Sequence, residues 1–452
     1  MLMKKIKKDI LNGKIPEQLI LLMLPSFLYY GIQLIYGIVD SIILGRYIGS
    51  EAMAGVNGSA TALINFVVNF LANMTSGVSV NVALQHGRGN REAVKENIRT
   101  GIFLLTIISL VVTLLGIFTS SWMLRITSVP ADAFDYSLKY LKIYCLSLVP
   151  QTVYYVGLNV LRAFGDSKRP LYFVVLTCVS KVLFDLLLII VFDLGVVGSA
   201  IATLLSFVLC CAAVLLIFQF TSDDYHFTIK DFGFDMPTLR SILKIGIPIG
   251  MQGGLFSGAN LFIQSRINML GTQTVAAYVA YSNVDNIFWN LDSAMSNAIM
   301  TVAGQNYGKG QIKRVRQTVL HSTIIEALGA FIIGGSVYYF ARPLISIFTT
   351  DPEVIELGIT MIRTVSIYYG FFAIVQAVSS TSKGCGYAIP PMIISATGIC
   401  ITRIGYLLLY PTQNCHDVLM AFPISWIVTA VMYIVYYLLN KNFKVDKSSS
   451  QK

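Results

Sequence analysis

Charged residues are scarce in this sequence, and the residue patterns that mark catalytic and metal sites are missing. Only 12% of its 452 residues are charged, whereas 55% are hydrophobic and the mean hydropathy is +0.69. Soluble domains carry about 25% charged residues. The seven cysteines and four histidines show no metal-ligand spacing, and neither His-x-x-x-His nor Gly-x-Ser-x-Gly occurs. The composition therefore excludes an ordinary soluble domain and favours a polytopic membrane protein that is not an enzyme.

The distribution of lysine and arginine along the chain is typical of membrane topology and not of a nucleic-acid site. The formal net charge is +10, and most lysines and arginines fall in the termini and in alternate connections between apolar runs. Cytoplasmic connections of membrane proteins are enriched in these residues. We therefore expect both termini in the cytoplasm and no nucleic-acid partner. No small-residue cleavage site follows the first apolar run, which predicts a retained N-terminal lead-in and not a signal peptide.

The apolar runs of spanning length form two copies of one unit. Pro25 and Pro248 are 223 residues apart, and Gly165 and Gly386 are 221 apart, with similar sequence around each pair. The predicted fold is an all-α polytopic membrane protein with twelve transmembrane helices in two parallel-repeat six-helix lobes. The predicted domains are a cytoplasmic lead-in (1–17), an N-lobe (18–220), a cytoplasmic linker (221–241), a C-lobe (242–440) and a cytoplasmic tail (441–452).

Asp40 lies well inside the first apolar run, where an ionised side chain costs about 2.5–3.5 kcal/mol on insertion scales. Tyr36, Gln33 and Tyr29 precede it at spacings of four, three and four residues, which places the four side chains on one helical face. A polar face with an acid on a membrane helix indicates a cavity and not lipid. Asp40 is therefore the candidate proton or cation site, with Gln33 and Tyr36 as candidate cavity residues.

The fifth apolar run carries Lys181 and Asp185 four residues apart, so that the two side chains can pair on one helical face. One interpretation is a structural ion pair that lowers the cost of insertion. The other is a coupling site that switches when Asp185 or Asp40 takes up a proton. The sequence leaves both interpretations open.

Polar side chains recur at helical spacing in the second and fourth apolar runs. The candidate cavity residues there are Asn65, Asn69, Asn73, Tyr144, Gln151 and Asn159. Amides are scarce against lipid because they would lack partners, and tyrosine rings suit amphipathic or cationic ligands. Hydrogen bonding between helices explains the amides equally well.

The second half is not a chemical copy of the first, because the positions that correspond to Asp40 and Asp185 hold no acid. The candidate cavity residues of this half are Gln264, Arg266, Asp285, Trp289, Asp292 and Arg403. Two acids with a tryptophan between them on one helical face suit contact with an organic cation. The alternative is that these acids pair with the two arginines.

Several short motifs occur in a fixed order along the chain. They are Val39-Asp-Ser-Ile-Ile-Leu-Gly-Arg46, Gln85-x-Gly-x-Gly89, Leu161-Arg-Ala-Phe-Gly165, Gly195-Val-Val-Gly-Ser-Ala-Ile-Ala-Thr203 and Gly304-Gln-Asn-Tyr-Gly308. Together with the two-lobe repeat, they resemble the multidrug and toxic compound extrusion (MATE) family nearly end to end. The resemblance is nearest to the bacterial branch named for DNA-damage-inducible protein F.

This resemblance implies a V-shaped, two-lobed multidrug exporter in a bacterial inner membrane, driven by inward Na⁺ or H⁺. It implies small organic substrates, mostly cationic, and we expect a monomer without a cofactor. The branch places its coupling site on an aspartate of the first span and an Asn-x-x-x-Asp pair of the fifth, which Asp40 and Asp185 match. Lys181 stands in place of the asparagine, which favours H⁺ over Na⁺. A flippase for lipid-linked saccharides, from the same superfamily, is the alternative.

Overall fold

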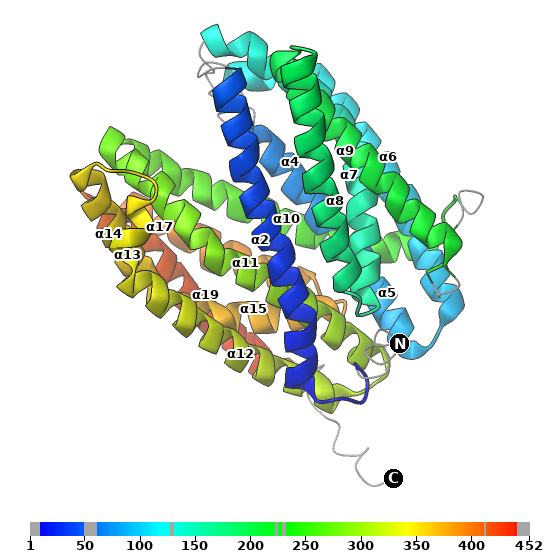
Figure 1. The fold of residues 1–452 in the computed structure, drawn as a ribbon. Coiled ribbons are helices and arrows are strands. Elements are labelled where there is room, and N and C mark those ends of the chain that lie inside the picture. Colours follow the sequence, from blue (N-terminus) through cyan, green and yellow to red (C-terminus); the bar gives the residue numbers. More distant parts are fainter. Residues whose placement is uncertain are drawn as a thin grey trace. The chain divides into compact units, whose positions relative to one another are not determined.

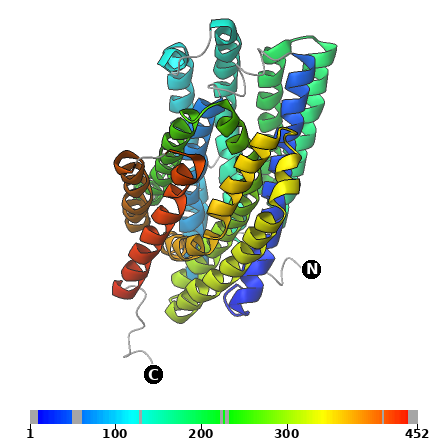
Figure 2. The same cartoon turned by 90° about the vertical axis from the view of Figure 1, so that its left-hand side faces the viewer.

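The computed structural model describes residues 10–48, 61–126, 131–221, 225–227, 232–410 and 413–440, and within these ranges it contains helices and no strand. The helices of the first half are α2 (Ile15–Tyr47), α4 (Thr61–Met74), α5 (Ser76–Arg88), α6 (Arg91–Ile126), α7 (Ala131–Ala163), α8 (Lys168–Asp185) and α9 (Gly195–Phe220). A π-helical segment, Leu186–Val191, continues α8. Figures 1 and 2 show α6, α7, α8 and α9 side by side.

The helices of the second half are long at its start and more often interrupted towards its end. They are α10 (Met236–Asn268), α11 (Thr272–Gly308), α12 (Ile312–Tyr339), α13 (Ala341–Ser346), α14 (Pro352–Ser366), α15 (Tyr369–Gly384), α16 (Ile389–Ser395), α17 (Thr402–Leu409), α18 (Cys415–Leu419) and α19 (Ala421–Leu439). A second π-helical segment, Ala396–Ile401, joins α16 to α17.

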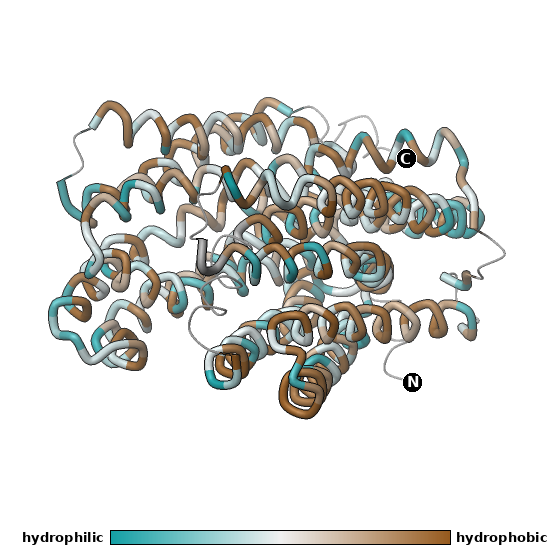
Figure 3. The backbone as a smooth tube through the Cα atoms, turned by 90° about the horizontal axis from the view of Figure 1, so that it is seen from above, coloured by the Kyte–Doolittle hydropathy of each residue, from teal (hydrophilic) through white to brown (hydrophobic). Residues whose placement is uncertain are grey.

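Eight helical segments of the described residues are long and apolar enough to cross a membrane, or nine if α14 and α15, bent by 48°, form one span. The other three predicted spans are α7, α10 and α11, which are 33, 33 and 37 residues long but carry more polar residues. Hydrophobic positions cover most of the helical length, as Figure 3 shows. Large apolar side chains such as Phe118, Phe331 and Leu409 are exposed, as expected for a surface that faces lipid.

The turns repeat with the period that the sequence predicts. Gly89 and Gly310, 221 residues apart, both have a positive φ, of 75° and 78°, which glycine adopts without steric cost. The same hydrogen bonds close both turns, from Gly89 N to His86 O and from Gly310 N to Tyr307 O. Gly165 and Gly386 repeat this relation. The internal duplication is therefore present in the backbone as well as in the sequence.

Two proline-containing helices, α2 and α10, are each divided between the two compact units of the chain. Unit 1 comprises Met1–Phe27 with Met251–Lys452, and unit 2 comprises Leu28–Gly250. The division falls two residues after Pro25 in α2 and two residues after Pro248 in α10. The compact units differ from the predicted lobes, 18–220 and 242–440, in the N-terminal parts of these two helices. Residues 18–27 belong to unit 1, and residues 242–250 belong to unit 2.

The first turns of α2 and α10 pack in related ways within their units. In unit 1, Leu19 of α2 packs in a buried cluster with Ile299 of α11. In unit 2, α10 passes close to α5. A Cβ on Gly77 of α5 would lie only 2.7 Å from the carbonyl oxygen of Ile242 on α10. Leu19 and Ile242 are 223 residues apart, the same separation as the two prolines. The repeat therefore extends to the way in which these helices pack.

Candidate functional site

Lys181 joins two carboxylates inside unit 2. Its Nζ lies 2.7 Å from Asp40 Oδ1 and 2.5 Å from Asp185 Oδ2. The side chains of Lys181 and Asp185 are 2% and 1% exposed, whereas that of Asp40 is 19% exposed. The structure therefore brings all three predicted coupling residues together and leaves Asp40 as the partly exposed member of the triad.

Local structure explains why the triad forms. Lys181 and Asp185 occupy the last turns of α8, one helical turn apart, and α2 supplies Asp40. Lys181 Nζ also donates to Ser199 Oγ of α9 at 3.3 Å. A Cβ on Gly198 would lie 3.1 Å from the backbone of Leu188, so this glycine lets α9 approach closely enough for the contact. Ser199 was not among the predicted residues, although it lies in the Gly195–Thr203 motif.

The triad carries a net charge of −1 when all three groups are ionised. Asp185 Oδ1 is buried and accepts no hydrogen bond from the described residues, so Lys181 is the donor to this carboxylate. The hydroxyls of Tyr36 and Tyr144 lie within electrostatic range of Asp40. The site thus offers a partly exposed acid next to phenol groups, with the other two members of the triad buried.

The amides predicted to line a cavity divide into two groups. The side chains of Asn65 and Asn69 on α4 are exposed, as a cavity wall requires. Asn73 is half-buried and donates to the carbonyl oxygen of Asn69 on its own helix. Phe66, which lies between Asn65 and Asn69, is exposed as well, so the cavity wall beside α4 stays a prediction.

The remaining amides of unit 2 lie in packed positions. Asn159 of α7 donates to Thr75 Oγ1 at 2.5 Å and accepts a bond from Arg162 at 3.4 Å. Gln151 and Gln33 donate to tyrosine hydroxyls on their own helices, at 3.3 and 3.2 Å. Hydrogen bonding that ties helices together, the alternative interpretation, therefore describes Asn159 best.

In unit 1, both carboxylate oxygens of Asp285 are already occupied. Trp289 Nε1 donates to Oδ2 at 2.6 Å, and the hydroxyl of Tyr369 donates to Oδ1 at 2.5 Å. The Tyr369 ring stacks on Phe288 with 4.0 Å between centroids. Asp285 is thus held by two donors in an aromatic cluster, and among the described residues it forms no ion pair with an arginine.

The two predicted arginines of unit 1 have different environments. Arg403 is buried, donates to Asn260 and Ser425 at 2.9 Å, and lies 4.4 Å from the ring centroid of Phe422. Arg266 is half-buried near the end of α10, with its guanidinium 5.7 Å from the centroid of Phe262. The half-buried Gln264 donates to Asn268 Oδ1 at 2.8 Å on the same helix.

Asp292 lies in a second buried group of ionisable residues. Its Oδ2 accepts a bond from Gln376 Nε2 at 2.6 Å, and Glu326 and Lys383 are its charged neighbours. Sequence reasoning missed Glu326 and Lys383. The signal for Glu326 was available, because it is an acid inside an apolar run, Ile324-Ile-Glu-Ala-Leu328, as Asp40 is.

The chain shares its fold and family with known transporters. The probable multidrug resistance protein YpnP of Bacillus subtilis is 25% identical over 408 residues, 89% of this chain and 90% of that protein. The probable multidrug resistance protein NorM of Thermotoga maritima is 26% identical over 396 residues, 86% of this chain and 84% of that protein.

Solved structures show the same fold. One of them, described as the outward-facing conformation of a multidrug resistance MATE family transporter of the MOP superfamily, aligns with a TM-score of 0.87 at 20% identity. The alignment covers 94% of this chain and 96% of that one. The predicted all-α, twelve-helix MATE fold is therefore confirmed. A model of the MatE family matches residues 25–187 and 248–408, once in each half and over more than half of the length, so the chain belongs to the MatE family of membrane transporters.

Proposed function

We propose that the protein is a secondary active antiporter that exports amphipathic, mostly cationic organic compounds in exchange for protons, by alternating access between two lobes. The observation that carries the proposal is the position of Lys181 between Asp40 and Asp185. Ionisable groups inside a membrane bundle are costly and are kept where transport or proton transfer needs them.

Lys181 favours protons over Na⁺ as the coupling ion. Its ammonium group already lies within hydrogen-bonding distance of both carboxylates, so a Na⁺ ion would have to displace it. A proton needs no such space because it binds directly to a carboxylate oxygen. Asp40 is the proposed acceptor, since it is the more exposed acid. Its protonation leaves a neutral Lys181–Asp185 pair and removes the ionic link from α2 to α8.

The site also suits the proposed substrates. Asp40 supplies negative charge, and the neighbouring Tyr36 and Tyr144 supply aromatic faces that attract organic cations. Exposed Asn65 and Asn69 offer hydrogen bonds without charge. The relatives named multidrug resistance proteins support small organic substrates.

The flippase alternative depends on basic groups that are free to bind phosphate. Lys181 is paired with two carboxylates, and Arg403 is buried against Asn260 and Ser425. Lys181 and Arg403 are buried, and Arg266 is the one of these three bases that is partly exposed and could reach a phosphate group. These contacts favour the cation exporter over the flippase.

The remaining features of the proposal concern the protein in the cell. We place it as a monomer in a bacterial inner membrane, with both termini in the cytoplasm and without a cofactor. The excess of lysine and arginine in alternate connections supports this orientation. Assignment to the branch named for DNA-damage-inducible protein F stays a prediction.

Efflux of the fluorescent cation ethidium from proteoliposomes tests the proposal, with proton and Na⁺ gradients imposed separately. A proton gradient drives export by the wild type, and Asp40→Asn abolishes this export. The matched control is Asp193→Asn, which makes the same change at an exposed aspartate in the connection from α8 to α9. Na⁺-driven, proton-independent export would refute proton coupling. Unchanged export by Asp40→Asn would remove Asp40 from the mechanism.

A further inference from the structure

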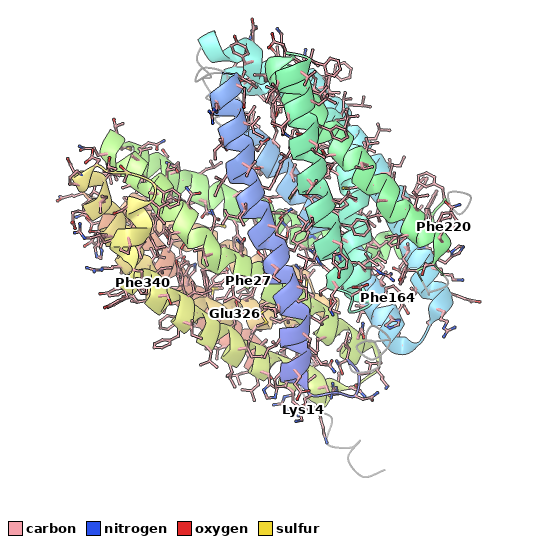
Figure 4. The ribbon with its side chains drawn as sticks, viewed as in Figure 1. Lys14, Phe27, Phe164, Phe220, Glu326 and Phe340 are labelled. Atoms are coloured by element: carbon pink, nitrogen blue, oxygen red, sulfur yellow. The ribbon has the colours of Figure 1, made fainter. Side chains whose placement is uncertain are left out.

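Two carboxyl groups meet in the interior of unit 1. Asp292 belongs to α11, and Glu326 lies in the middle of α12, where Figure 4 labels it. Glu326 is fully buried, and neither of its carboxyl oxygens accepts a bond from a donor among the described residues. Asp292 Oδ1 also lacks a donor there, while Oδ2 accepts from Gln376.

The geometry of the pair requires a proton. Asp292 and Glu326 lie within side-chain hydrogen-bonding range of each other. Two carboxylates only accept hydrogen bonds, so a bond between them needs a proton on one of the two groups. Two like charges buried at this separation would also repel strongly in a medium of low dielectric constant. One shared proton satisfies both conditions.

Lys383 of α15 balances the remaining charge. It is buried, faces Asp292, and lies 3.4 Å from Gln252 Oε1. Among the described residues, Lys383 is the titratable group that acts on the pair from another element. The other helices packed on α11 and α12, including α14 and the first turns of α2, add none. With one proton on the pair, the group of three is neutral.

A polar route leads away from the pair. Gln376, which donates to Asp292, accepts a bond from Ser380 at 3.2 Å, and Ser380 lies 2.8 Å from Ser296 Oγ. Ser296 is only half-buried. This chain of hydrogen-bonding groups connects the buried carboxyls with a partly exposed position, and proton exchange requires such a route.

We propose that Asp292 and Glu326 share one bound proton and form a second proton-exchanging site, in unit 1. The proton moves between the two carboxyl groups, and when it leaves, the group of three carries a net charge of −1. The acid that was predicted as a contact for organic cations, Asp292, therefore has a different ligand. This inference stands whether or not Asp40 couples transport to protons.

Infrared difference spectroscopy on the full-length protein in lipid vesicles tests the pair directly. At neutral pH the wild type shows the carbonyl stretching band of a buried carboxylic acid, and this band reversibly becomes a carboxylate band at alkaline pH. Glu326→Gln and Asp292→Asn both lose the band at neutral pH, because the new amide donates to the remaining carboxylate and takes over the role of the proton. Asp285→Asn is the matched control and keeps the band, since Trp289 and Tyr369 already satisfy Asp285.

A protonated-acid band that survives in both Glu326→Gln and Asp292→Asn would overturn the proposal, as would a wild-type band that does not respond to alkaline pH. Thermal unfolding against pH gives a second readout that needs no transport. The wild type loses more stability on alkalinisation than Glu326→Gln. Loss of the shared proton leaves two buried carboxylates in the wild type, whereas the variant has a single carboxylate at every pH. Equal pH profiles of the two proteins would contradict the shared proton. Asp40→Asn retains the band, so a failure of coupling at Asp40 is distinguishable from a failure here.

Discussion

Replacing Lys181 by methionine removes the ammonium that links Asp40 to Asp185 and keeps most of the side-chain volume. Removing one partner of a buried ion pair costs about 3–5 kcal/mol, because the other charge is left buried and unpaired. Asp185 meets this condition, since its side chain is 1% exposed and its second oxygen has no donor among the described residues. Asp40 is 19% exposed and adds less, because water screens it.

The loss depends on pH in a defined direction. Without Lys181, Asp185 can avoid being an isolated buried charge by taking up a proton. The free energy of this uptake becomes less favourable by about 1.4 kcal/mol for each unit by which the pH rises. The folded state of the variant then binds a proton that the unfolded state releases. Stability of Lys181→Met therefore falls as pH rises, and the difference from the wild type shrinks on acidification.

Unfolding titrations with dodecyl sulfate in mixed micelles, followed by tryptophan fluorescence, measure these free energies. Lys181→Met combined with Asp185→Leu removes both buried charges and returns to within about 1–2 kcal/mol of the wild type, since apolar replacement of a buried pair is often neutral. Lys168→Met, at an exposed lysine of the same helix, changes stability by no more than about 0.5 kcal/mol. A single Lys181 variant as stable as this control at alkaline pH would refute the reasoning.

Three further predictions concern packing and the helix ends. Gly246→Val destabilises unit 2 by about 1–3 kcal/mol, because its Cβ would meet a backbone carbonyl oxygen at 2.7 Å; a thermal melt measures the loss. Asp235 accepts a bond from Thr238 N, which lowers the pKa of its carboxyl. The charge-dependent part of its contribution to stability is therefore lost as pH falls, and Asp235→Asn, whose amide oxygen still accepts the bond, shows no such pH dependence. Arg314→Met frees the N-terminal segment at Ile10, whose carbonyl oxygen the guanidinium binds at 3.1 Å, and limited proteolysis there becomes faster.

Each of these predictions has a clear negative result. Gly258→Ala, where a Cβ would meet nothing within 4 Å, is the control for Gly246→Val, and equal melting temperatures would contradict the packing argument. For Asp235, parallel pH profiles of variant and wild type would show that the charge of this carboxylate adds no stability. Cleavage near Ile10 at the wild-type rate would show that Arg314 does not hold that segment.

Hydrophobic patterning predicted the spans correctly because membrane helices are long and their apolar faces are nearly continuous. Glycine pairs near 87–89 and 308–310 mark two of the turns, without showing which glycine of each pair takes the left-handed conformation. Gly87 and Gly308 lie within the last turns of α5 and α11, and the positive φ values belong to Gly89 and Gly310. Sequence pattern locates a turn to within a few residues, whereas the residue that takes the left-handed conformation depends on which carbonyl groups need donors.

The roles of polar residues were harder to predict than the helices that carry them. Asp285 and Trp289 were correctly placed on one helical face, but their direct bond and the second donor, Tyr369, depend on the approach of another helix. Asn69 and Asn159 have the same chemistry, yet one is exposed and the other ties α7 to Thr75. Periodicity predicts on which face of a helix a residue lies, but not which neighbouring element packs against that face.

The sequence by itself determined the class of this protein, its repeat, its spans and the acids that stand out in them. These features are local or periodic, so they can be read from composition and spacing. The tertiary structure alone decided which charges meet. Asp40 reaches Lys181 across 141 residues, and Glu326 reaches Asp292 from a neighbouring helix. Such contacts depend on how each helix is rotated against its neighbours, which packing of all the side chains decides together.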